Sequence, residues 1–189
     1  MASTGPKLIY PLRYATRLRG YDYSQGSCYF VTICVHERKA IWGTVSDTAF
    51  RPNRLGEIAA ETWVSIPSLF LGVELDSWVI MPNHCHGIIV LPDKITRGSR
   101  AASTPTQEVS GESQSPIEPP PSLARVINGY KSVSAKLINR HRGCVGEKVW
   151  QRSFYDHVVR DQWDLDAIRE YINNNPLKWS LDEENPESE

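Results

Sequence analysis

Two histidines stand two residues apart at the start of an apolar run, in the segment 81–88 with the sequence Met-Pro-Asn-His-Cys-His-Gly-Ile. Alternate residues of a β-strand point to the same face, so a strand here places the His84 and His86 side chains together and Cys85 opposite. Neutral imidazole is a good ligand for several divalent metals, and two imidazoles on a rigid strand form a bidentate site. The spacing therefore indicates metal binding, with two histidines that hydrogen-bond to loops as the alternative.

A second chemical feature lies near the C-terminus, where Tyr171 and Asn175 precede Pro176. Residues i and i+4 of a helix share one face and lie about 6 Å apart along its axis. The pattern thus places a phenol next to an amide. On this spacing alone, a surface pair without further function is the favoured interpretation.

Positive charge is concentrated in two segments, although the formal net charge of the 189-residue chain is −1. Residues 1–21 and residues 123–142 each carry several cations and no acid, whereas acids collect after residue 181. Separated basic segments indicate a polyanionic partner, and arginines interleaved with tyrosines in the N-terminal arm suit phosphate contact and base stacking. The alternatives are solvated faces and an arm that packs its tyrosines on the domain.

The cysteines indicate a reducing compartment. Cys28, Cys34, Cys85 and Cys144 form no Cys-x-x-Cys pair, and three of them lie in apolar runs, which suits buried thiols better than a disulfide framework. No apolar run approaches the ~20 residues that a membrane span needs, and the first residues lack an apolar leader segment. The sequence therefore predicts a soluble, cytoplasmic protein.

Apolar periodicity and β-prone composition predict four strands, at residues 28–35, 73–80, 84–91 and 154–160, with a short edge piece at 41–45. A first helix is expected over 53–66, ended by Pro67.

Two further helices follow in the C-terminal half. Ser122 should cap a long second helix whose apolar side includes Val133 and Leu137. Asp161 or Asp164 should cap the last helix, which Pro176 ends.

The chain is predicted to form one domain over residues 28–179, with a basic arm at 1–27 and an acidic tail at 180–189. Segment 93–122 is rich in Ser, Thr, Pro, Gln and Glu, a composition that predicts a disordered insertion. The order of elements predicts an α+β fold: a ferredoxin-like antiparallel sheet with helices on one face, plus a C-terminal helix. If that helix lies across the sheet, it brings Tyr171 above the two histidines.

Motifs along most of the chain outside 93–122 resemble those of the HUH single-tyrosine (Y1) transposases, most closely the REP-associated tyrosine transposases. They are Gly20-Tyr21-Asp22-Tyr23, Tyr29-Phe30-Val31-Thr32, Met81 to Ile88, Tyr130-Lys131-Ser132, Val149-Trp150-Gln151-Arg152 with His157, and Arg169-Glu170-Tyr171-Ile172 through Asn175-Pro176. The order and spacing of these motifs are specific, although no single motif is. Cys85 at the centre of the His-hydrophobe-His motif is a mild departure, because a free cysteine behaves as a small apolar residue.

The resemblance implies that Tyr171 is the catalytic nucleophile and that His84 and His86 bind Mg²⁺ or Mn²⁺, with Asn175 as a third ligand. The implied reaction is DNA transposition: metal-dependent cleavage and rejoining of single-stranded DNA at hairpin or palindromic sites through a 5′-phosphotyrosine intermediate. The partner is single-stranded or hairpin DNA, the enzyme a monomer or homodimer, and the site of action the bacterial cytoplasm at the nucleoid. DNA contacts are expected at Arg13, Arg17, Arg19, Tyr21, Lys131, Lys136, Arg140 and Arg152.

Two other functions fit the same residues, namely a hairpin-binding regulator without catalysis and a nickase of the replication-initiator or relaxase type. A covalent protein–DNA adduct separates the regulator from both enzymes, and strand joining separates transposase from nickase. Among the tyrosines, Tyr130 falls on an apolar helix stripe and Tyr155 on a strand. Tyr171 lies outside the apolar stripe of the last helix, on an element that can move, which favours it as the nucleophile.

Overall fold

A computed structural model describes residues 27–46, 49–92, 120–181 and 185. Its centre is a four-stranded antiparallel sheet with the strand order β4-β5-β1-β6. The strands are β1 (Cys28–Cys34), β4 (Glu74–Ile80), β5 (His84–Val90) and β6 (Tyr155–Val158). With a helix between β1 and β4 and another between β5 and β6, this order is the predicted ferredoxin-like arrangement.

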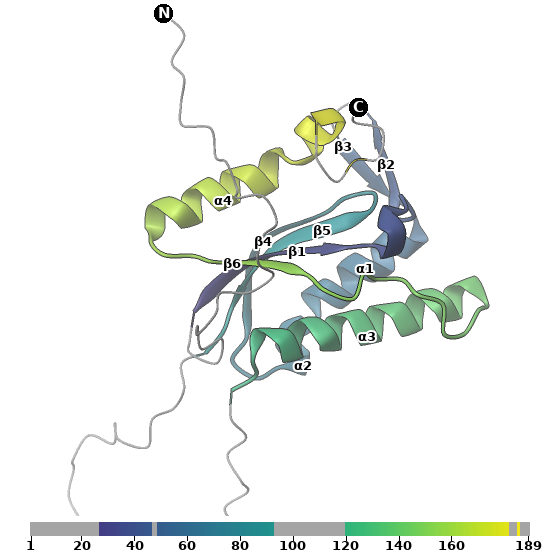
Figure 1. Cartoon of the computed structure of the whole chain (residues 1–189), viewed down its shortest axis with the longest axis horizontal. Coiled ribbons are helices and arrows are strands. Elements are labelled where there is room, and N and C mark those ends of the chain that lie inside the picture. The colour runs from purple at the N-terminus through teal and green to yellow at the C-terminus, as the bar shows by residue number, and fades with distance from the viewer. Residues whose placement is uncertain (1–26, 47–48, 93–119, 182–184, 186–189) are drawn as a thin grey trace, which may run out of the picture.

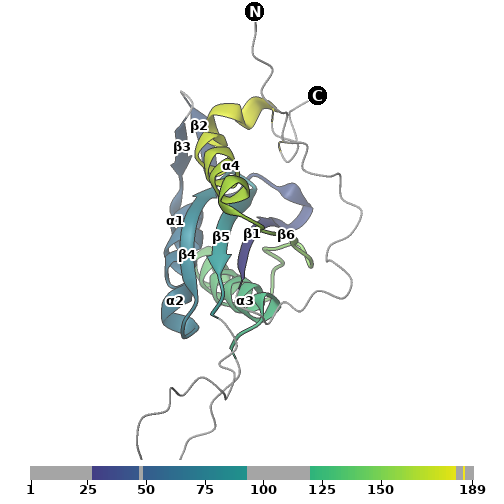
Figure 2. The ribbon, with the colours of Figure 1, turned by 90° about the vertical axis from the view of Figure 1, so that its left-hand side faces the viewer.

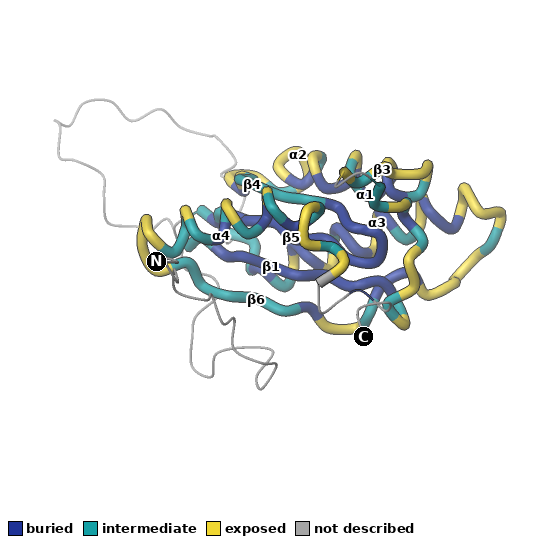
Figure 3. The backbone as a smooth tube through the Cα atoms, turned by 90° about the horizontal axis from the view of Figure 1, so that it is seen from above, coloured by how far each residue is buried: buried dark blue, intermediate teal, exposed yellow. Residues whose placement is uncertain are grey.

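Helices cover both faces of the sheet. The helices α1 (Arg54–Val64) and α3 (Leu123–Arg142) lie on one face, and α4 (Gln162–Asn174) crosses the other face (Figures 1 and 2). The two central strands β1 and β5 are buried along most of their length between these layers (Figure 3). The C-terminal helix therefore lies across the sheet, which is the arrangement that brings Tyr171 above the two histidines.

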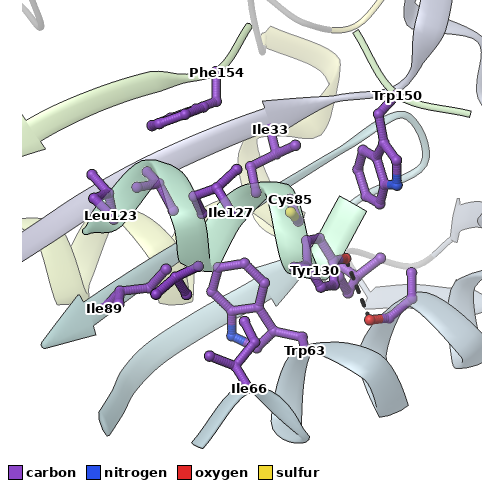
Figure 4. Packing of buried hydrophobic residues seen from close by; sticks show 14 of the residues in the cluster. Ile33, Trp63, Ile66, Cys85, Ile89, Leu123, Ile127, Tyr130, Trp150 and Phe154 are labelled. Carbon is purple, nitrogen blue, oxygen red and sulfur yellow. Dashed lines mark hydrogen bonds between the residues drawn. The ribbon is translucent and has the colours of Figure 1, made fainter. Parts of the chain in front are cut away.

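The alternation predicted for the histidine strand is confirmed. Cys85 and Ile89 belong to the large core under α1 and α3, together with Trp63 and Tyr130 (Figure 4). Ile88 faces the opposite way and joins the smaller cluster beneath α4. Since His84 and His86 alternate with Cys85, both imidazoles lie on the α4 side.

Helix α1 differs in detail from its prediction. Asn53 caps its start by accepting hydrogen bonds from the backbone N–H groups of Leu55 and Gly56, at 2.9 and 3.1 Å. The helix ends at Val64, and the short helix α2 (Ile66–Leu69) begins directly after it, with Pro67 in its first turn. The prediction that Pro67 ends a helix was wrong because proline is tolerated in a first turn, where its missing N–H has no helical partner to lose.

Helix α3 is capped by Ser122 as predicted, and it ends at Gly143, whose φ of 70° is left-handed. Its predicted apolar stripe is wrong at two positions, since Val133 and Leu137 are 38% and 41% exposed. Polar residues of α3 are buried instead, and they form hydrogen bonds with the chain that follows the helix. For example, Ser134 accepts a hydrogen bond from Trp150 Nε1 at 3.0 Å. Hydrogen bonds of this kind allow polar side chains to be buried on α3.

The remaining elements are short. The segment expected as one edge piece forms half of a separate hairpin of β2 (Gly43–Ser46) and β3 (Ala49–Pro52). The 3₁₀ turns η1 (His36–Arg38) and η2 (Pro176–Leu181) follow β1 and α4. Asp161 caps α4, one of the two predicted candidates. The described residues include all four cysteines, which form no disulfide, and in this part of the chain no helix is long and apolar enough to cross a bilayer.

Candidate active site

The histidine pair lies at the start of β5, beneath α4. His84 Nε2 and His86 Nε2 are 3.0 Å apart, and the two side chains are almost fully buried. Their rings meet at a centroid distance of 4.5 Å and an interplanar angle of 64°. The two nitrogens therefore point at each other on one face of the strand.

Asn83 fixes the orientation of His84. Its amide nitrogen donates to the Arg38 carbonyl at 3.0 Å, which leaves its amide oxygen facing His84 Nδ1 at 2.8 Å. Because an amide oxygen only accepts, Nδ1 of His84 carries the proton and Nε2 carries a lone pair. A metal-binding imidazole needs this tautomer, set by the hydrogen bond of its other nitrogen.

Thr32 contacts His86 without fixing its tautomer. Its hydroxyl lies 2.8 Å from His86 Nδ1, opposite the strand position of the histidine in the β1–β5 ladder. A hydroxyl can donate or accept. His86 can therefore share a proton with His84 through Nε2, or move its proton to Nδ1 and offer Nε2 to a cation.

The charge state of His84 suits a ligand. Burial, together with the positive charge of Arg38, lowers the pKa of His84 to about 3, so the ring is neutral at physiological pH. Arg38 itself stands in a strained turn, because it and Glu37 have φ values of 53° and 57°. Left-handed backbone at two successive non-glycine residues costs free energy and concentrates at functional sites.

Tyr171 of α4 reaches the same point. Its hydroxyl lies 3.3 Å from His86 Nε2, and its ring meets the His86 ring at a centroid distance of 5.1 Å. Phe30 of β1 supports both rings: it stacks on His86 at 5.4 Å and presents a perpendicular face to Tyr171 at 5.9 Å. The structure thus brings together the phenol and the two imidazoles.

The third predicted ligand, Asn175, is the C-cap of α4, one turn beyond Tyr171, and is 2% exposed. Just after it, Trp179 of η2 lies beside His84 with ring centroids 5.9 Å apart. The C-terminal end of α4 and the start of η2 therefore close one side of the histidine pair.

The donor set fits a hexacoordinate divalent cation. Two ligands at right angles with bonds of ~2.1 Å lie roughly 3.0 Å apart, which is the separation of the two Nε2 atoms. Within the described residues, no group of three or more His, Cys, Asp or Glu side chains could hold a metal. The two imidazoles are the donors whose spacing the structure shows, and Asn175, one turn beyond Tyr171, is the third ligand that the family resemblance implies. Mg²⁺ prefers oxygen ligands. In a six-coordinate site with three protein donors, oxygens of phosphate and water would fill the remaining positions.

The predicted DNA contacts are spread over other surfaces. Lys136 and Arg140 are exposed on α3, on the face of the sheet opposite the histidines, and Arg152 is exposed in the loop before β6. Arg13, Arg17, Arg19 and Tyr21 lie outside the described residues, as do the predicted insertion, except for residues 120–122, and most of the acidic tail.

Lys131 lies in the core rather than on the exposed side of α3. Its ammonium donates to the carbonyls of Gln151 and Ser153 at 2.9 and 2.8 Å and lies over the Phe154 ring. Burial lowers the pKa of Lys131 to about 8. The side chain therefore holds the backbone on both sides of Arg152 instead of facing solvent.

Sequence reasoning missed four supporting residues: Phe30, Thr32, Asn83 and Trp179. Asn83 adjoins His84 in sequence, so its polar side chain at a strand entry was a usable signal. Phe30 and Thr32 needed the register of β1 against β5, in which they lie opposite Ile88 and His86.

Comparisons with known proteins give consistent results. A family model described as "Transposase IS200 like" matches residues 116–175. The chain is 31% identical over 178 residues to an uncharacterized protein of Haemophilus influenzae, covering 90% of this chain and 92% of that protein. It is 27% identical over 159 residues to another protein of that organism, provisionally named a REP-associated tyrosine transposase, with coverages of 83% and 74%.

The fold is shared with a solved structure. It is described as a REP-associated tyrosine transposase bound to a REP hairpin, and it matches with a TM-score of 0.51 at 18% sequence identity. The match covers 88% of this chain and 75% of that one.

Proposed function

Because the chain belongs to the IS200-like family of single-tyrosine (Y1) transposases, we propose that it cleaves and rejoins single-stranded DNA at hairpin or palindromic sites. The observation that carries this proposal is the Tyr171 hydroxyl 3.3 Å from His86 Nε2, beside the second imidazole 3.0 Å further on. A nucleophile and two candidate ligand atoms then lie next to one another, so that a scissile phosphate bound above β5 would be within reach of the Tyr171 hydroxyl and of a cation held by the two imidazoles.

Tyr171 is the proposed nucleophile. Its oxygen attacks the scissile phosphorus, the O3′ of the upstream strand leaves as a free 3′-OH, and the downstream strand remains attached as a 5′-phosphotyrosine. Another 3′-OH reverses the reaction, so strands are rejoined without ATP. With an ordinary pKa of about 10, phenolate is a better leaving group than an alkoxide, which keeps the linkage reversible.

His84, His86 and Asn175 are the proposed ligands of Mg²⁺ or Mn²⁺, which, when bound, would polarise the phosphoryl oxygen and offset its developing charge. The chain's own residues prepare that position. Asn83 and Thr32 hold the imidazole rings, and Phe30 supports His86 and Tyr171 from below. Such fixed rings need no reorganisation when the phosphate arrives.

The proposed partner is hairpin DNA, the ligand named for the solved relative. Lys136 and Arg140 present an exposed basic face on α3, and Lys131 holds the loop from which Arg152 projects. Arg13, Arg17, Arg19 and Tyr21 of the arm supply further cations and an aromatic ring for single-strand contact. Arginine and lysine contacts to phosphates position a nucleic acid without reading its sequence.

The test is adduct formation with labelled single-stranded hairpin oligonucleotides and Mn²⁺, followed by denaturing electrophoresis. Wild type should give a slow-migrating covalent species that EDTA abolishes. Tyr171→Phe should remove the adduct while hairpin binding persists. Tyr155→Phe is the matched control. Tyr155 also packs on Phe30, at a ring-centroid distance of 6.5 Å, but none of the hydrogen bonds described joins it to the histidines.

Each result has a distinct meaning. An adduct that survives Tyr171→Phe contradicts the assignment of the nucleophile, and one that survives EDTA contradicts the metal. If wild type binds the hairpin but forms no adduct, the result supports a hairpin-binding regulator without catalysis.

A further inference from the structure

Strand β4 contains a bulge at Asp76 and Ser77. In its ladder with β5, Leu75 pairs with Ile89 and Trp78 pairs with Gly87, so three steps along β4 match two along β5. Leu75 and Trp78 consequently both pack against the large core, although they are an odd number of residues apart. The extra residue re-aims the side chain between them, as bulges beside functional sites do.

At this bulge the Asp76 carboxylate contacts α4. Arg169 Nε donates to Asp76 Oδ1 at 2.9 Å and Arg169 Nη2 donates to Asp76 Oδ2 at 2.6 Å. The Ser77 backbone N–H donates to Oδ1 from the other side. Hydrogen bonds from Arg169 lower the pKa of Asp76 to about 2, so the carboxylate is charged throughout the physiological range.

The ion pair stands next to the nucleophile. Arg169 precedes Tyr171 by two residues on α4. The helix also contacts the sheet through apolar side chains that include Ile168 and Ile172, and through Asp164 in its first turn, whose carboxylate lies 2.8 Å from His157 Nε2 of β6. Apolar burial is non-directional and allows a helix to rotate or slide. A bidentate Arg–carboxylate pair has a fixed geometry and restricts both movements.

We propose that the Asp76–Arg169 pair is a latch that positions Tyr171 for attack, an inference that rests on the proposed function. With the latch closed, the Tyr171 hydroxyl lies 3.3 Å from His86 Nε2. A displacement of about 1 Å would be enough to slow the reaction greatly. Arg169 and Asp76 are thus positioning residues and contact neither DNA nor metal.

A stabilising role alone does not account for this arrangement. The side chains of Arg169 and Asp76 are 37% and 24% exposed, and pairs open to solvent contribute little to stability. Arg169 also has a carboxylate on its own helix, since its Nη1 donates to Asp166 at 3.1 Å. That partner compensates the charge without attaching α4 to the sheet, so Asp166 offers a matched control.

The experiment compares Asp76→Asn, Arg169→Gln, the double variant and Asp166→Asn by single-turnover adduct formation, hairpin affinity and hydrogen exchange. Each latch variant should form the adduct about five- to tenfold more slowly, with hairpin Kd unchanged and the melting temperature lowered only slightly, as for the loss of a partly exposed ion pair. The double variant should be no slower than either single one, because both remove the same contact. Amides of α4 should exchange faster while those of β1 and β5 do not, and Asp166→Asn should match wild type.

Adduct formation at the wild-type rate in Asp76→Asn, or an equal loss in Asp166→Asn, overturns the latch. Unchanged exchange in α4 overturns it too. If wild type forms no adduct, the proposed function fails, whereas hydrogen exchange still decides whether the pair holds α4.

Discussion

Gly87 follows His86 on β5, and replacing it by alanine tests how tightly the histidine strand is packed. A Cβ at this position would overlap Trp63 Cζ2 of α1 and lie 2.9 and 3.0 Å from Trp63 Cη2 and Cε2. The Trp63 ring is fully buried and meets Tyr130 edge to face at 5.1 Å. It has no room to withdraw, so the strand or the helix must move.

The expected cost follows from that overlap. Adding a methyl group to a well-packed core costs about 1–3 kcal/mol, and a chain of this size loses roughly 2–4 °C of melting temperature per kcal/mol. Gly87→Ala should therefore melt about 2–12 °C below wild type. The small gain from restricting the unfolded chain, about 0.5–1 kcal/mol, does not offset the overlap.

Thermal and urea unfolding of Gly87→Ala, with Gly129→Ala as the control, measures the effect. Gly129 is inside α3, and its Cβ would meet Phe70 Cζ at 2.6 Å, the far end of a half-buried side chain. The gain in helix propensity, about 1 kcal/mol, should keep that variant near wild type. Trp63→Phe, which removes the overlapping ring, should make Gly87→Ala less costly in the double variant. Equal stability of Gly87→Ala and wild type, or additive costs in the double variant, would refute the packing argument.

Two further predictions concern charge. Asp76 has a folded-state pKa near 2 against an ordinary 3.8, so its contribution to stability is present above pH 4 and is lost as the pH falls towards 2. The free energy of unfolding in urea should therefore differ less between pH 2.5 and pH 6 in Asp76→Asn than in wild type. An identical difference in the two proteins contradicts the pairing. Charge reversal of Lys136 and Arg140 should weaken hairpin binding and flatten its dependence on salt, measured by fluorescence anisotropy; unchanged binding at every salt concentration would exclude this face of α3 as a DNA surface.

The order of elements and the face of the histidines could be predicted from the sequence because both follow from local periodicity. Alternation within residues 84–91 separates Cys85 from the two histidines whatever the rest of the chain does. Caps are local as well: Ser122 and Asp161 each accept a hydrogen bond from an N–H three residues on. Such features need no knowledge of distant residues.

The contacts that orient the site could not be predicted, because they depend on register. Thr32 and His86 are 54 residues apart, and Asp76 and Arg169 are 93 residues apart. The bulge that re-aims Asp76 leaves no signal in the apolar pattern of β4. The burial of Lys131 also depends on distant residues, because a lysine on a helix is usually exposed and only the loop carbonyls that it binds allow its burial.

The two halves of the proposed site are attached to the fold in different ways. The two histidines stand on β5, whose other face belongs to the large core under α1 and α3. Tyr171 stands on α4, beneath which the fully buried apolar side chains among the described residues are Phe30, Ile88, Ile168 and Ile172. Since the free energy of local opening follows the apolar surface that must be exposed, α4 can separate from the sheet at lower cost than β5 can move. In the proposed reaction this asymmetry would be needed for rejoining: the tyrosine stays bonded to one DNA end while another 3′-OH enters the site, and the two histidines hold their positions on β5.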